Sequence, residues 1–167
     1  LDTGGVVQDA ESLSAQIARL KALETYNLNR VITFHSRVSS AKQFSEDLPR
    51  LMTTHEDLIE TDYSLWADYV SGKHNAHQRK QTIDVLRHLP DSDKGLLANA
   101  RCLSEGVDVP SLDGVAFVDP RSSQVDIIQA VGRAIRLSDN KTRGIIILPV
   151  FISSTEDHEA ALNDSSF

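Results

Sequence analysis

The chain has 167 residues, 40% of them hydrophobic and 25% charged, which is the composition of a globular protein and not of a disordered one. Its formal net charge of −7 argues against a protein that coats nucleic acid through an extended basic surface. The one cysteine, Cys102, excludes an internal disulfide and a cysteine-based metal cluster, and no apolar run approaches the roughly 20 residues that cross a bilayer, so we expect a cytoplasmic protein with no membrane partner.

Four stretches carry apolar residues at helical spacing and predict helices. In the first, residues 10–26, four aliphatic side chains recur with polar residues between them. The second helix is expected over residues 39–52, with Ser39 or Ser40 as its N-cap. The other two are expected over residues 75–89 and 123–135.

Short apolar runs between these helices predict strands. Runs that are apolar throughout, without alternation, indicate strands that are buried on both faces of a parallel sheet. We therefore predict one α/β domain over residues 1–150, with a parallel sheet of five or six strands and helices on both faces. The predicted strands lie within residues 30–37, 65–72, 94–100, 113–119 and 143–152.

Polar, small or cationic residues follow the predicted strands. In an open α/β sheet, ligands bind beyond the carboxyl ends of the strands, so these residues should share one edge. The stretch Lys73–Lys80 carries three positive charges and no negative one. We favour the solvated start of a helix as its explanation, with phosphate contact as the alternative. The segments in question are 35–37, 71–74, 101–110 and 119–124, and together they suit contact with a polyanion and a nucleotide.

The stretch "SEGVDVP" follows the third predicted strand. Gly106 permits a positive φ angle or a close backbone approach, and Pro110 stops regular structure. Asp108 lies between two valines, where an unpaired buried carboxylate would be costly. Asp108 either caps backbone amides in a turn or accepts hydrogen bonds from a ribose hydroxyl.

The stretch "QAVGRAIRLS" ends the fourth predicted helix with two arginines three residues apart, Arg133 and Arg136. One interpretation is a pair of cations that is favoured at the helix C-terminus by the helix dipole. The other is a pair of guanidinium groups that faces a phosphate, because arginine stays charged and offers a planar fork of donors.

Three stretches together resemble the superfamily-two helicases. "QAVGRAIR" resembles their motif VI, "SEGVDVP" their motif V and "VITFHSR" their motif IV, in the family's order and over roughly residues 30–148. The chain thus resembles the second, C-terminal RecA-like domain of a DEAD/DEAH-type motor. Within that group it is most similar to the type III restriction-like DNA helicases.

The resemblance implies an ATP site in the cleft between two RecA-like domains. Arg133 and Arg136 would be arginine fingers on the γ-phosphate. Gln129 would orient the nucleotide or couple it to nucleic acid, and Gly132 belongs to the same motif. Asp108 would contact the ribose, and Gly106 would allow close approach. ATP with Mg²⁺ would be bound mainly by an N-terminal RecA-like domain of the same parent chain.

The resemblance also implies contacts with the sugar-phosphate backbone of a nucleic acid, with DNA favoured. Ser36, Gly72 and Asn99 lie where family members make such contacts. Motif V usually carries a threonine six residues before its glycine, where this chain has Ala100, so Asn99 or Arg101 would substitute. Contacts of this type position a strand without reading its sequence.

Two motifs of a complete motor are missing from the printed sequence. It contains neither a Gly-x-x-x-x-Gly-Lys-Ser/Thr phosphate loop nor an Asp-Glu-x-Asp/His tetrad, and its six histidines show no metal-ligand spacing. We therefore expect the chain alone to be inactive in ATP hydrolysis and unwinding. We expect a longer parent protein, in which the acidic tail 151–167 leads to a further domain.

Two alternatives to an ATP-dependent helicase remain at this point. The first is an ATP-driven translocase or remodeller of a restriction-type complex that does not separate strands. The second is a RecA-like module that binds without catalysis.

Overall fold

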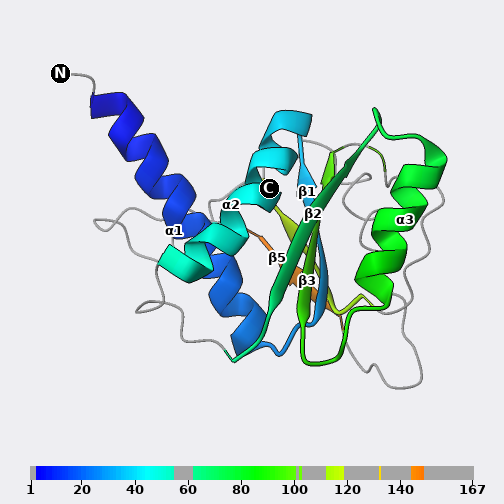
Figure 1. The fold of residues 1–167 in the computed structure, drawn as a ribbon. Helices are drawn as coiled ribbons and strands as arrows, with labels where there is room; N and C mark the ends of the chain where they lie inside the picture. Colours follow the sequence, from blue (N-terminus) through cyan, green and yellow to red (C-terminus); the bar gives the residue numbers. More distant parts are fainter. Residues whose placement is uncertain are drawn as a thin grey trace.

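The computed structural model describes residues 3–54, 62–100, 102, 112–118, 132 and 144–148. Helices and strands alternate from α1 to β3, and β4 and β5 follow in the described part of the chain, as Figure 1 shows. The helices are α1 (Thr3–Thr25), α2 (Val38–Thr54) and α3 (Ala76–Arg87). The strands are β1 (Arg30–His35), β2 (Leu65–Ser71), β3 (Lys94–Ala100), β4 (Gly114–Phe117) and β5 (Ile145–Ile147).

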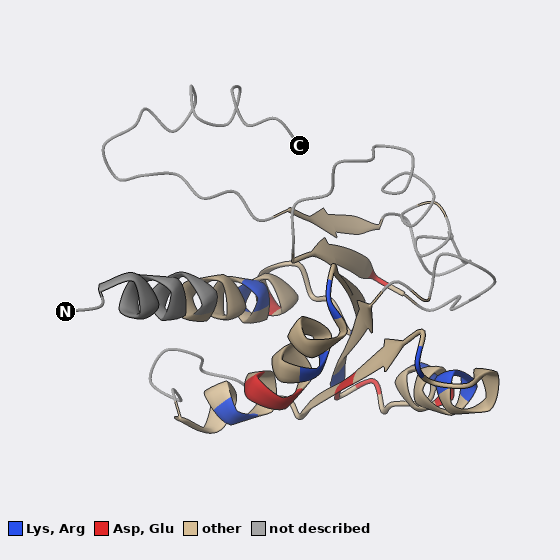
Figure 2. Cartoon of the chain, turned by 90° about the horizontal axis from the view of Figure 1, so that it is seen from above, with Lys and Arg blue, Asp and Glu red and all other residues tan. Residues whose placement is uncertain are grey.

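The five strands form one parallel sheet in the order β2-β3-β1-β4-β5. Helices α1 and α2 cover one face of this sheet and α3 covers the other (Figure 1). The view from above in Figure 2 shows the same layers, with the sheet between α2 and α3. The predicted α/β class, the parallel sheet and the helices on both faces are confirmed.

Each face of the sheet has its own hydrophobic core, because successive side chains of a strand point to opposite faces. In β1, Val31 belongs to the core beneath α1 and α2, whereas Ile32 belongs to the core beneath α3. Both side chains are at most 3% exposed. The continuous apolar runs of the sequence arise from this double burial.

Two local features fix α3 on its face. Asn75 caps the helix by accepting from the Gln78 N–H, and the Gln78 side chain accepts in return from the Asn75 N–H, both at 2.9 Å. Gly95 of β3 lets the helix end come close, because a Cβ atom there would lie 2.4 Å from Leu86 Cδ1 and 2.6 Å from Leu89 Cδ1.

The helix boundaries differ from the predicted ones. Helix α2 begins at Val38, so the prediction of Ser39 or Ser40 as its N-cap is wrong: both lie in the first turn. The Ser40 hydroxyl lies 3.2 Å from the His35 ring instead, so this side chain joins the helix to β1. Helix α1 begins earlier than predicted, at Thr3. The predicted helix 123–135 lies outside the described residues except for Gly132, which is helical.

None of the helices in the described part of the chain has the length and apolar character needed to cross a membrane.

Candidate functional site

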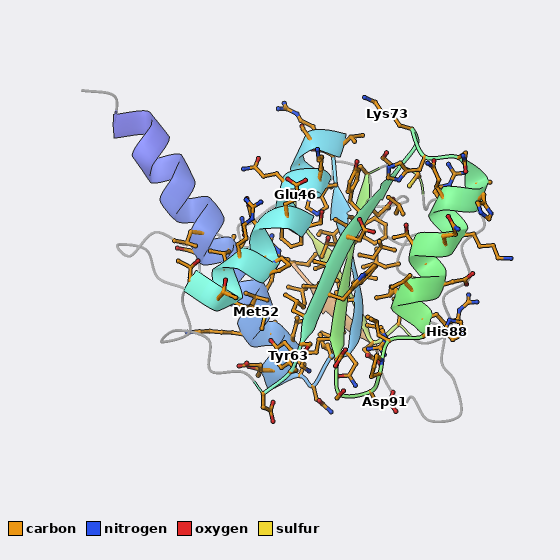
Figure 3. The ribbon with its side chains drawn as sticks, in the orientation of Figure 1. Glu46, Met52, Tyr63, Lys73, His88 and Asp91 are labelled. Atoms are coloured by element: carbon orange, nitrogen blue, oxygen red, sulfur yellow. The ribbon has the colours of Figure 1, made fainter. Side chains whose placement is uncertain are left out.

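Three of the sequence-predicted contact residues lie at the carboxyl edge of three adjacent strands. His35 of β1 and Ser71 of β2 both pair with Ala100 of β3, so Ser36 and Gly72 follow directly on either side of that strand end. Asn99 pairs with the preceding residues of both neighbours. The prediction of a shared edge is confirmed for the segments 35–37 and 71–74, whereas the segments 101–110 and 119–124 lie outside the described residues apart from Cys102. Figure 3 labels Lys73 at this edge of the molecule, with His88 and Asp91 at the opposite edge.

Gly72 is exposed, and a Cβ atom at this position would meet nothing within 4 Å. The turn around it is closed by a backbone hydrogen bond from the His74 N–H to the Ser71 carbonyl at 3.1 Å. Lys73 beside it is exposed. This turn therefore presents an open backbone position and a cation to the outside of the carboxyl edge.

The segment Lys73–Lys80 forms that turn and the start of α3. Its helical part begins at Ala76 and is mostly exposed, as expected for a solvated helix start. Arg79 is half-buried, and its guanidinium donates to the His74 carbonyl at 2.6 Å. Arg79 therefore holds the turn in place, whereas Lys73 and Lys80 extend into solvent.

Asn99 is only 1% exposed. Its Oδ1 accepts hydrogen bonds from the backbone N–H and the Sγ of Cys102, both at 3.2 Å. The side chain thus ties Cys102 to the end of β3, and this structural role accompanies the predicted contact with nucleic acid, which stays a prediction.

Cys102 packs against the core beneath α3. Desolvation by burial raises the pKa of its thiol to about 11, and the charge of Arg79 opposes this shift. A neutral thiol suits a packing role and not that of a nucleophile.

His35 and Arg37 flank Ser36 and differ sharply in their surroundings. Arg37 is exposed and Ser36 is half-buried, so both can meet a ligand at this edge. His35 is 0% exposed, and its ring lies under α2 against Phe44, with the ring centroids 4.9 Å apart. His35 therefore belongs to the interior and does not form part of the contact surface.

Ser71 is buried, which the sequence did not reveal. It is 0% exposed, and within the described part of the chain its Oγ has no hydrogen-bond partner. The period-two alternation of β2 places Ser71 on the sheet face that α2 covers, the same face as His35. That alternation is the sequence signal that places these two side chains in the interior, whereas Ser36 and Gly72, which follow them, are half-buried and exposed.

The remaining predicted site residues lie outside the described residues, with one exception. Gly132 is exposed, and a Cβ atom there would meet nothing within 4 Å. The others are Arg101, Gly106, Asp108, Gln129, Arg133 and Arg136.

Comparison with known families identifies one model, the helicase conserved C-terminal domain, which matches residues 15–138. Among curated proteins, African swine fever virus (strain Badajoz 1971 Vero-adapted) has "Probable helicase A859L", 39% identical over 113 residues, which is 66% of this chain and 12% of the viral protein. The ATP-dependent RNA helicase has-1 of Neurospora crassa is 25% identical over 148 residues, which is 89% of this chain and 23% of that protein. The chain thus spans less than a quarter of the length of these curated relatives.

Solved structures share the fold. The ATP-dependent Type ISP restriction-modification enzyme LlaBIII bound to DNA matches with a TM-score of 0.68 and 35% identity, over 78% of this chain and 8% of that one. Domain 2 of the DEAD-box helicase Mss116p bound to an RNA duplex matches with a TM-score of 0.55 and 17% identity, over 83% of this chain and 49% of that one. The second likeness concerns the fold alone.

Proposed function

This chain belongs to the helicase conserved C-terminal domain family, as the C-terminal, RecA-like domain of a superfamily-two helicase, and from this premise we propose that it supplies arginine fingers and part of the nucleic-acid track to an ATP-driven motor. One observation carries the proposal. Three positions expected to meet nucleic acid come from segments far apart in the sequence, and the parallel register gathers them at one sheet edge.

The residues of motifs V and VI have side chains whose chemistry suits ATP. Guanidinium groups suit a polyphosphate, and a carboxylate suits a ribose hydroxyl. Gly132, which precedes Arg133 in the sequence, is exposed, with open space where a Cβ atom would lie. Arg133 and Arg136 would hold the γ-phosphate and stabilise the charge that develops during phosphoryl transfer.

The other nucleotide contacts follow from motifs V and VI. Asp108 would accept hydrogen bonds from the ribose, with Gly106 beside it, and Gln129 would link the nucleotide to bound nucleic acid. The phosphate-binding loop and the Mg²⁺ ligands would come from an N-terminal RecA-like domain of a longer parent protein. Because the chain lacks both of those motifs, we propose that it neither hydrolyses ATP nor unwinds a duplex alone.

For nucleic acid, the exposed part of the carboxyl edge would meet the sugar-phosphate backbone. Ser36 and the backbone of the open turn at Gly72 would contact successive phosphates of the nucleic acid. Asn99 or Arg101 would make the contact that the usual threonine of motif V makes. The neighbouring cations Arg37 and Lys73 are both exposed and would add attraction for phosphate. DNA is the favoured track because the structure with 35% identity is an enzyme bound to DNA.

A second candidate function shares the same residues. The parent would be a translocase of a restriction-type complex that moves along DNA without separating its strands. The likeness to a Type ISP restriction-modification enzyme favours it. The third possibility, a binding module without catalysis, is disfavoured because Arg133 and Arg136 are both present.

The test is ATP hydrolysis by the longer parent protein, compared between wild type and Arg136→Ala. Each would be assayed without nucleic acid and with single-stranded DNA, duplex DNA or RNA. We expect stimulation by one polymer and a loss of about 10²-fold or more in the mutant. The matched control is Arg87→Ala, which removes an exposed arginine at the end of α3.

Absence of activity with every polymer, or an Arg136→Ala rate equal to that of the wild type, would support the binding module instead. A duplex-unwinding assay on the same parent separates the helicase from the translocase.

A further inference from the structure

His35 is the last residue of β1, and its imidazole is hydrogen-bonded at both nitrogens. Nε2 lies 2.9 Å from the Thr33 Oγ1, and Nδ1 lies 3.2 Å from the Ser40 Oγ. The ring is fully buried and packs at a tilt on Phe44 of α2. A hydroxyl can donate or accept, so either neutral tautomer of the ring is satisfied in this position.

The two hydrogen bonds of His35 have different mechanical consequences. The bond to Thr33 stays within β1 and leaves the position of α2 unconstrained. The bond to Ser40 crosses from the strand to the first turn of the helix. Of the two, the second bond joins the end of the sheet to the start of α2.

The loop between β1 and α2 consists of Ser36 and Arg37 alone. It is closed on the helix side by the hydrogen bond from the Ala41 N–H to the Arg37 carbonyl at 3.1 Å. It is closed on the core side by the bond between His35 and Ser40. A two-residue loop held at both ends cannot reorient without moving the first turn of the helix.

We propose that His35 is a positioning residue, which through Ser40 holds Ser36 and Arg37 in the orientation that receives a nucleic-acid backbone. This inference rests on the proposed function of the carboxyl edge. It assigns a role in nucleic-acid binding to a side chain that the ligand never touches, because His35 is 0% exposed.

Two substitutions of His35 separate its two hydrogen bonds. In His35→Asn the shorter amide reaches the position of Nδ1 and keeps the bond to Ser40. In His35→Gln the longer amide reaches the position of Nε2 and keeps the bond to Thr33. Each variant loses one hydrogen bond of the buried ring, so both should lose a similar amount of stability.

Their affinities for nucleic acid should differ. In the longer parent protein, we expect His35→Asn to bind a fluorescein-labelled oligothymidylate within about twofold of wild type, and His35→Gln to bind it about tenfold more weakly. The loss should appear in the DNA concentration that gives half-maximal ATPase rate and not in the maximal rate. An oligouridylate of equal length tests the RNA track in parallel.

The partner hydroxyls provide a second, gentler pair. Ser40→Ala removes the strand-to-helix bond and should weaken binding as His35→Gln does. Thr33→Val removes the bond within the strand at nearly constant volume and should bind as wild type does. The double variant His35→Gln/Ser40→Ala should be no weaker than either single variant, because both remove the same link.

Equal affinities for Ser40→Ala and Thr33→Val would overturn the positioning role. So would losses of affinity that simply parallel the losses of stability in all four single variants. Either result would leave the proposed function intact. A wild-type parent that binds neither oligonucleotide would instead contradict the proposed function, and the positioning role with it.

Discussion

Cys102 lies just beyond the end of β3, where its Sγ donates to Asn99 Oδ1 at 3.2 Å and its side chain packs against the core beneath α3. Desolvation disfavours the thiolate, and the pKa of the thiol rises to about 11 although the Arg79 charge acts in the opposite direction. Reactivity at this residue is therefore governed by the fold and not by the basic character of the surrounding sequence.

We predict that iodoacetamide modifies Cys102 slowly in the native chain at pH 8 and faster as the pH approaches 11. The unfolded chain in urea should react at the ordinary rate for a cysteine, since its thiol is hydrated. Mass spectrometry follows the reaction without ambiguity because the chain has one cysteine. Native and unfolded chains that react equally fast at pH 8 would contradict the raised pKa.

The same pKa has a consequence for stability. Below the ordinary thiol pKa, the folded and the unfolded chain both keep the thiol proton, and the contribution of Cys102 to the free energy of unfolding is complete. Above it the unfolded chain loses its proton first, so this contribution to the free energy of unfolding falls as the pH rises toward 11. The variant Cys102→Ala should lack this part of the alkaline loss.

At the scale of elements, the C-terminal end of α1 shows how a helix is attached to the sheet. Asn27 adopts a φ angle of 49°. Its N–H donates to the Glu24 carbonyl at 3.0 Å, and the Leu28 N–H donates to the Leu23 carbonyl at 2.8 Å. This is the pattern of a Schellman motif, in which Leu23 and Leu28 also share the hydrophobic core beneath the helix.

A buried lysine adds a second attachment at the same helix end. The Lys94 Nζ donates to the Leu23 carbonyl at 3.2 Å and to the Leu28 carbonyl at 3.1 Å. It also lies 5.0 Å from the centre of the Tyr63 ring. Desolvation lowers the pKa of Lys94, and nearby acidic residues, Glu24 first among them, oppose the shift. The helix end is thus joined to β3 through a charged side chain.

We predict that Asn27→Ala destabilises the chain by about 1 kcal/mol, because alanine lacks the tolerance of asparagine for positive φ angles. Asn27→Gly should be neutral or slightly stabilising, because glycine adopts this conformation without strain. Urea denaturation followed by circular dichroism measures both. An alanine variant as stable as the glycine variant would show that the φ angle of 49° does not govern this helix end.

At the scale of the whole molecule, the two edges of the sheet differ in what their polar groups do. At the amino edge, the buried Arg30 guanidinium donates to the carbonyls of Asn29, Leu89, Pro90 and Asp93. Asp113, just before β4, accepts from two backbone N–H groups at the start of β1 at 2.8 Å. This edge connects three strands, whereas the carboxyl edge presents open and cationic positions.

We predict that Arg30→Met lowers the free energy of unfolding by about 2–4 kcal/mol, since it leaves several part-buried carbonyls without their donor. Asp113→Asn should cost much less, because its amide oxygen can still accept from both N–H groups. In the parent protein, Arg30→Met should leave the affinity for oligothymidylate unchanged when measured below its unfolding range. A loss of affinity in Arg30→Met under these conditions would show that the amino edge contributes to nucleic-acid binding.

The positions of the helices and strands follow closely from the sequence. The five strands lie within the predicted runs. The central strands β1, β3 and β4 are buried along their whole length and are therefore mostly apolar, whereas the edge strands β2 and β5 are partly exposed. Helix starts were less predictable: the capping box of α3 agrees with local preferences, but Ser40 is recruited by His35 and does not cap α2. That contact depends on tertiary packing.

Part of the candidate site could be predicted from the sequence, because its position depends on where the strands end. Parallel strands must end at a common edge, so the gathering of Ser36 and Gly72 follows once the strands are identified. The inward orientation of His35 and Asn99 does not follow, because it depends on which helix covers which face. Arg37 is exposed and His35 is buried, although both are polar and they are two residues apart, so the sequence alone does not tell them apart.

The sequence by itself determined the class of the fold, the places of its strands and the motifs of the helicase family, because apolar periodicity and motif spacing are local properties of the chain. Tertiary structure alone decided that β1 lies between β3 and β4, and that His35 joins the sheet to α2. Strand order and side-chain burial depend on contacts between residues distant in the chain. A local sequence pattern does not say which other strand or helix its segment will pack against.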